Sequence, residues 1–78
     1  MRYTLKQHAK QRMRQRGITE ADLMSALGNI ILQRDAEPGS VCILGLVGDG
    51  RKLAIYVSGS MPPSEPLAIR TVVWRDGT

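Results

Sequence analysis

The stretch HAKQRMRQRGIT, residues 8–19, concentrates side chains that can do chemistry. It contains the only histidine of the chain and four of its basic side chains. In a helix, His8, Arg12 and Arg16 recur every four residues and therefore form one stripe. Arginine can hold phosphate oxygens in a bidentate manner, and histidine can exchange a proton near neutral pH. The pattern predicts a site for metal-independent RNA cleavage, with His8 as acid or base and both arginines as phosphate clamps.

The same stripe has a structural interpretation. Arg12 and Arg16 could tie the helix to its neighbours, or pair with carboxylates such as Glu20 and Asp22. The protein would then be a non-catalytic interaction module whose basic helix docks on an acidic partner protein or on nucleic acid. Guanidinium groups buried against carboxylates favour this hypothesis, whereas guanidinium groups that converge with His8 on an open cleft favour catalysis.

Positive charge is concentrated at the beginning of the chain. Residues 1–19 carry six basic and no acidic side chains, whereas residues 20–78 carry five basic and seven acidic ones. A basic segment on a mildly acidic body indicates an anionic partner, such as nucleic acid or an acidic protein surface, and RNA is the nucleic acid expected. The further nucleic-acid-binding candidates, four cationic side chains and one aromatic ring that could stack on a base, are Lys6, Lys10, Arg14, Tyr56 and Arg70.

Length and composition predict one domain over residues 1–78. The single cysteine, Cys42, excludes an internal disulfide, and one cysteine with one histidine excludes an ordinary zinc site. No metal or other cofactor is expected. We find neither a signal-peptide pattern nor the roughly 20 apolar residues that a membrane-spanning helix needs. The expected location is therefore the cytoplasm.

Two helices are predicted at the start of the chain. Leu5, Ala9 and Met13 have helical spacing, which predicts a helix over residues 5–16 with Thr4 as its N-cap and Gly17 after its end. A second helix is predicted over residues 20–27, and the list of residues 1–27 expected to face the core is Leu5, Ala9, Met13, Ile18, Leu23 and Leu27. Its start carries a capping box, formed by Thr19 and Asp22.

The remaining residues have strand patterns separated by turns. The predicted strands are IILQRD (30–35), VCILGLV (41–47), RKLAIYVSG (51–59) and LAIRTVVW (67–74). Short connections such as GDG favour antiparallel pairing. The predicted fold class is α+β, with two N-terminal helices packed on a four-stranded, mostly antiparallel sheet.

Residues 8–19 also resemble the pattern His-Ala-x-x-Arg-Met-x-x-Arg-Gly-Ile-Thr of a family of small bacterial proteins filed as a domain of unknown function. That family is similar to the RelE/ParE and BrnT group of toxin–antitoxin toxins. The resemblance implies their compact fold of helices on a twisted antiparallel sheet, a ribonuclease activity and a cognate antitoxin as partner. Its polar positions correspond to His8, Arg12 and Arg16, whereas Tyr56, Arg70 and Arg75 are candidates for the functional side chains of the sheet.

Overall fold

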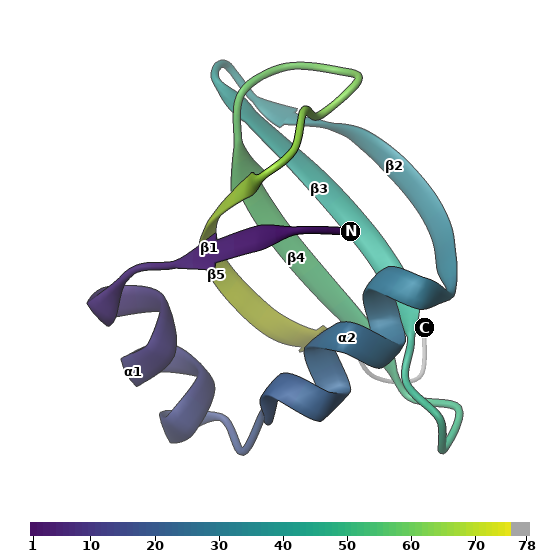
Figure 1. The fold of residues 1–78 in the computed structure, drawn as a ribbon. Helices are drawn as coiled ribbons and strands as arrows, with labels where there is room; N and C mark the ends of the chain where they lie inside the picture. The colour runs from purple at the N-terminus through teal and green to yellow at the C-terminus, as the bar shows by residue number, and fades with distance from the viewer. Residues whose placement is uncertain (76–78) are drawn as a thin grey trace.

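The computed structural model describes residues 1–75 and contains two helices and one sheet. Along the chain the elements are β1 (Tyr3–Leu5), α1 (Gln7–Gln15), α2 (Glu20–Gly28), β2 (Ile30–Glu37), β3 (Ser40–Leu46), β4 (Lys52–Ser58) and β5 (Leu67–Arg75). The strands form a five-stranded sheet in the order β1-β5-β4-β3-β2. Figure 1 shows that the sheet is curved and that both helices lie on one of its faces.

Helix α2 begins as predicted, and helix α1 does not. The Thr19 hydroxyl accepts a hydrogen bond from the Asp22 N–H, and the Asp22 carboxylate accepts one from the Thr19 N–H, which confirms the capping box. The N-cap of α1 is Lys6 rather than Thr4, and within the described residues no side chain caps this helix. Gly17, with φ +67°, ends the α1 region in the left-handed conformation that glycine adopts at low cost.

Strands β2 to β5 form an antiparallel meander. Each strand pairs with the next along the chain. The GDG turn between β3 and β4 is closed by two backbone hydrogen bonds, from Val47 N–H to the Arg51 carbonyl and from Gly50 N–H to the Val47 carbonyl. The Asp49 carboxylate accepts from the backbone and side chain of Arg51, and these bonds lower the pKa of Asp49.

The prediction of a four-stranded, mostly antiparallel sheet was wrong, because residues 3–5 add a fifth strand. Strand β1 pairs in parallel with β5, and Tyr3 and Leu5 face Leu67 and Ile69. The Leu67 N–H also donates to the Arg2 carbonyl at 2.9 Å. Leu5 shares the helical spacing of Ala9 and Met13 by coincidence, and three residues are too few to show the two-residue period of a strand.

The core lies between the helices and the sheet. Ala9 and Met13 of α1 and Leu23 and Leu27 of α2 are buried in it together with Ile18, as predicted, and Leu5 of β1 packs against it partly buried. The inward side chains of the strands complete it, and they are Val41, Ile43, Leu53, Ile55, Val57, Leu67, Ile69 and Val72. Helix α1 packs mainly on β5 and α2 mainly on β3, so each helix has its own part of the sheet.

Candidate nucleic-acid interface

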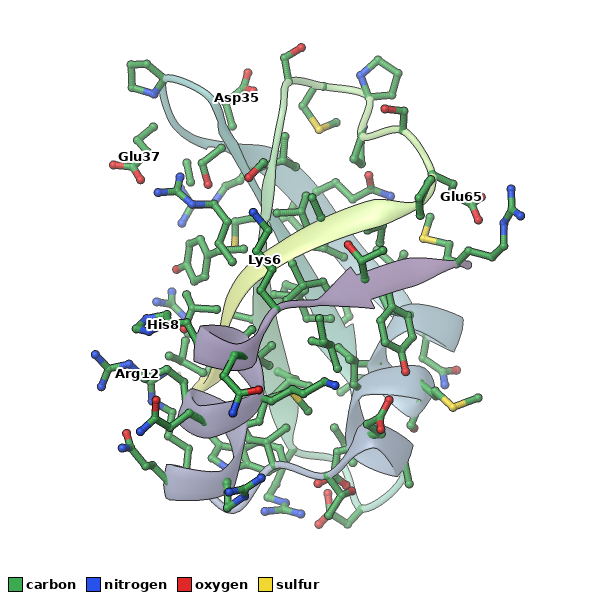
Figure 2. All side chains as sticks on the ribbon, turned by 60° about the vertical axis from the view of Figure 1, so that its left-hand side comes forward. Lys6, His8, Arg12, Asp35, Glu37 and Glu65 are labelled. Atoms are coloured by element: carbon green, nitrogen blue, oxygen red, sulfur yellow. The ribbon has the colours of Figure 1, made fainter. Side chains whose placement is uncertain are left out.

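Helix α1 carries basic side chains on two different faces. On one face, His8 and Arg12 project to the same side, away from the core (Figure 2). The Arg12 Nε–H donates to His8 Nε2 at 3.5 Å, the outer limit of a hydrogen bond. On the other face, Lys10 and Arg14 line a groove of about 250 Å³ whose floor includes Met13. The predicted cations of α1 therefore do not form one site.

His8 lies where α1 runs beside β5. Strand β1 pairs with β5 only at Leu67–Ile69, so the edge of β5 is not covered by β1 beyond Ile69. There His8 and Arg70 together line two adjoining cavities. The first has a volume of about 230 Å³ and is lined by Thr4, Lys6, His8, Ala9, Ser58, Ala68, Ile69 and Arg70. The second has a volume of about 350 Å³ and is lined by His8, Glu37, Ser40, Tyr56, Arg70 and Thr71.

Arg70 reaches this position because β5 contains a bulge. Tyr56 pairs with Thr71 and the next residue, Val57, pairs with Ile69, so Arg70 has no partner on β4. A bulge re-aims the extra side chain relative to the regular alternation of a strand. Arg70 Nη1 lies 3.6 Å from Glu37 Oε1, and the two side chains are 51% and 66% exposed, respectively. An exposed pair of this kind contributes little to stability, so Arg70 remains available to another anion.

Tyr56 lies on the face of the sheet that the helices do not cover. Its neighbours Ile55 and Val57 are fully buried in the core, and alternation along the strand directs Tyr56 to the other side. Burial raises the pKa of the Tyr56 phenol and the Cys42 thiol raises it further, whereas Arg75 and Arg34 act in the opposite direction. The phenol is therefore neutral at physiological pH and presents an aromatic ring and a hydroxyl beside two guanidinium groups.

The sheet register extends this surface across the molecule. One row on the open face runs through Arg34, Cys42, Tyr56 and Thr71, one residue from each of β2 to β5. The next row is apolar, and the row after it contains the pair Lys52 and Arg75. Two cavities continue from Tyr56 along Arg34 to Arg75. We call this continuous surface the basic trough, and its principal side chains are Lys6, His8, Arg70, Tyr56, Arg34 and Arg75.

Arg16 is not among the residues that line the two cavities beside His8, although its partner Thr71 lines the larger one. Its Nη1 donates to the Thr71 hydroxyl and to the Val72 carbonyl, both at 3.0 Å. Its own carbonyl accepts a hydrogen bond from Trp74 Nε1 at 2.8 Å. Arg16 thus connects the end of α1 to β5, and the predicted stripe of three side chains is divided between two environments.

Arg34 and Arg75 are the trough side chains to which the prediction gave least weight. Arg34 was not among the predicted site residues, and Arg75 was a candidate only through the family resemblance. The signal for Arg34 was a basic side chain two residues from Leu32, on the same side of a strand. Its meaning depended on the neighbouring strands, because only the register brings Arg34 into one row with Tyr56.

No three His, Cys, Asp or Glu side chains within residues 1–75 come together as metal ligands would. Across the same residues, no helix has both the length and the apolar character needed to cross a membrane.

Fold and surface together define a small α+β protein with two helices on one face of a mixed sheet and a basic trough that runs from the start of α1, past β5, onto the other face. The chain belongs to the family described as a domain of unknown function, DUF4258, whose model matches residues 5–75. This match agrees with the predicted membership in a small family of that kind. No curated protein and no solved structure matches the chain significantly.

Proposed function

We propose that the protein is a toxin-type RNA-binding protein that holds single-stranded RNA in the basic trough. The observation that carries the proposal is that His8 and Arg70, from a helix and a strand far apart in sequence, line the same two cavities. A phosphate held by Arg70 lies within reach of the imidazole. Tyr56 lines the second of these cavities and offers an aromatic face on which a base can stack.

The proposed activity is metal-independent cleavage of the bound strand. His8 takes the proton of a 2′-hydroxyl, whose oxygen attacks the adjacent phosphorus, and the bond from phosphorus to the 5′-oxygen breaks. The products are a 2′,3′-cyclic phosphate and a 5′-hydroxyl that takes its proton from water, and the hydroxide so formed takes the proton that His8 holds. Arg70 stabilises the negative charge that develops on the phosphate. Because the bond from Arg12 to His8 is long, substrate can replace it and leave Arg12 to hold a second phosphate.

Residues 8–19 resemble the signature of a domain-of-unknown-function family that is similar to the RelE/ParE and BrnT-like toxins, and this resemblance supports the same proposal. It adds the expectation of a cognate antitoxin that blocks the toxin, and the cytoplasmic location expected from the sequence is part of the same proposal. The two helices leave one face of the sheet open to such an antitoxin.

RNA binding is tested with two arginine variants of the same charge change. Arg70→Gln removes a cation from the trough, whereas Arg14→Gln removes one from the opposite face of α1. In fluorescence anisotropy with a labelled single-stranded RNA, we expect Arg70→Gln to weaken binding about tenfold, because a charged hydrogen bond to phosphate contributes about 1.5–3 kcal/mol. Arg14→Gln should change affinity less than twofold. Equal losses in both variants, or a wild type that binds no RNA, would contradict the proposal.

One observation favours the alternative of a non-catalytic interaction module. The groove beside Lys10 and Arg14 combines those cations with an apolar floor, and its opposite wall carries Glu20. This combination suits an acidic segment of a partner protein with an apolar anchor. Under this alternative the wild type binds its partner through the groove and does not cleave RNA, and substitution of His8 leaves every measured property unchanged.

A further inference from the structure

The two cavities beside His8 differ in the charge of their lining. The larger cavity contains Glu37, which pairs with Arg70. The smaller one is lined by Lys6, His8 and Arg70 with the hydroxyl-bearing residues Thr4 and Ser58, and among its described lining residues none carries a carboxylate. The smaller cavity is therefore the more strongly cationic of the two.

This difference in charge distinguishes two kinds of phosphate. A phosphodiester within an RNA strand carries one negative charge, whereas a phosphate monoester carries about 1.5–2 negative charges at pH 7 and three terminal oxygens. Lys6 and Arg70 supply two permanent positive charges. The charge of the lining matches the monoester better than the diester.

The size and hydrogen-bonding groups of the cavity suit the same ligand. Its volume of about 230 Å³ accommodates a phosphate group with several waters, each of which occupies about 30 Å³. Lysine provides three donors and arginine five, enough for the three terminal oxygens of a monoester. The Thr4 hydroxyl donates to the Leu67 carbonyl at 3.4 Å, a long bond that a phosphate oxygen can replace.

We propose that the smaller cavity binds the terminal phosphate of an RNA strand. The inference rests on the proposed function and makes it more specific. The terminal phosphate lies between Lys6 and Arg70, and the strand continues past His8 toward Tyr56, because the two cavities adjoin at His8 and Arg70. The protein then recognises the end of a strand in addition to its backbone.

The test compares three RNA oligonucleotides of one sequence, with a 5′-phosphate, with a 3′-phosphate, and with hydroxyl groups at both ends. We expect one of the two phosphorylated strands to bind about tenfold more tightly than the hydroxyl-ended strand, as one or two charged hydrogen bonds allow. Lys6→Gln should abolish this preference, because it should weaken binding of the phosphorylated strand more than binding of the hydroxyl-ended strand. The matched control Lys10→Gln, one turn further along α1 on its other face, should keep the preference.

The outcomes separate this inference from the proposed function. Equal affinity for all three strands overturns the terminal-phosphate site and leaves RNA binding in place. Absence of binding to every strand overturns both. A third outcome is that inorganic phosphate or a mononucleotide binds in a Lys6-dependent manner while the three strands bind equally. The ligand of the cavity is then a small phosphate compound, and the proposal that it is the end of an RNA strand is overturned. Both lysines are exposed, and thermal unfolding checks that their variants remain folded.

Discussion

His8 lies at the beginning of α1, beside the edge of β5, and its surroundings decide what it can do. Apart from aliphatic side chains, its neighbours in the two cavities are cations, hydroxyl groups and an aromatic ring, and the one carboxylate among them, Glu37, is engaged with Arg70. A histidine that only braced the helix would need a hydrogen bond to the fold. The imidazole of His8 instead accepts from Arg12 of the same helix, which is itself exposed.

We predict that His8→Ala abolishes RNA cleavage and leaves the fold intact. Removal of a positioned acid or base lowers a rate by about 10²–10⁴-fold. The measurement is the rate of appearance of cyclic-phosphate products from a labelled RNA in the presence of a chelator.

His8→Gln is the matched control for this prediction. Glutamine keeps an acceptor for Arg12 but cannot exchange a proton near neutral pH. It should therefore be as inactive as alanine, with an unchanged unfolding midpoint. A fully active His8→Gln variant, or a wild type that does not cleave RNA, would show that this histidine is not catalytic.

The partner of Arg16 could not be predicted from the sequence. Spacing correctly placed it on the helix, one turn after Arg12, and charge suggested an anion. Whether Arg16 binds a phosphate or a protein acceptor depends on which groups lie beside the end of α1. In the fold these groups are the Thr71 hydroxyl and the Val72 carbonyl of β5. No local pattern in residues 8–19 contains that information, because the two segments are more than fifty positions apart.

At the scale of elements, the sequence correctly predicted the features that depend only on residues close together in the chain. The capping box at Thr19 and the glycine after α1 are decided within a few residues, and both were predicted correctly. The strands from β2 to β5 were predicted to within a few residues, since alternation and turns are also local. Strand β1 was missed because three residues have no periodicity of their own, and β5 determines their conformation.

The contact between α2 and β3 provides a prediction at this scale. A Cβ atom added to Gly45 would lie 2.7 Å from the Ala26 carbonyl carbon and 2.9 Å from Ala26 Cα. The helix approaches the strand this closely only because Gly45 has no side chain. We expect Gly45→Ala to push α2 away from β3 and to lower the free energy of unfolding by about 1–3 kcal/mol or more, the usual cost of overpacking.

Gly48→Ala is the control for that measurement. It is the same chemical change three residues later, at a glycine where an added Cβ would have no neighbour within 4 Å and where φ is not positive. Its midpoint in urea unfolding should stay close to that of the wild type. Equal midpoints for the two variants would contradict the close approach of α2 to β3.

For the whole molecule, the sequence showed where the basic residues lie along the chain but not which of them share a surface. The basic N-terminal segment was evident, but the fold divides its cations between two faces of α1. The trough then gains Arg34 and Arg75 from the mildly acidic remainder of the chain. Net charge therefore indicated an anionic partner, and the sheet register determines which cations can contact it together.

This division predicts how salt affects RNA binding. Each phosphate neutralised on a single strand contributes a slope of roughly −0.7 to log K against log salt concentration. Four contacts along the trough would give a slope of about −3 for the wild type. The double variant Arg34→Gln with Arg75→Gln should reduce the magnitude of the slope by about 1.4, because two contacts are lost.

The double variant Lys10→Gln with Arg14→Gln makes the same change in net charge on the other face of α1, and its slope should equal that of the wild type. Titrations at four salt concentrations measure all three slopes. If both double variants reduce the slope equally, RNA responds to the overall charge of the protein and not to the trough. If only the variant at Lys10 and Arg14 does so, the RNA lies in the groove beside those residues, and the open face of the sheet is not its binding surface.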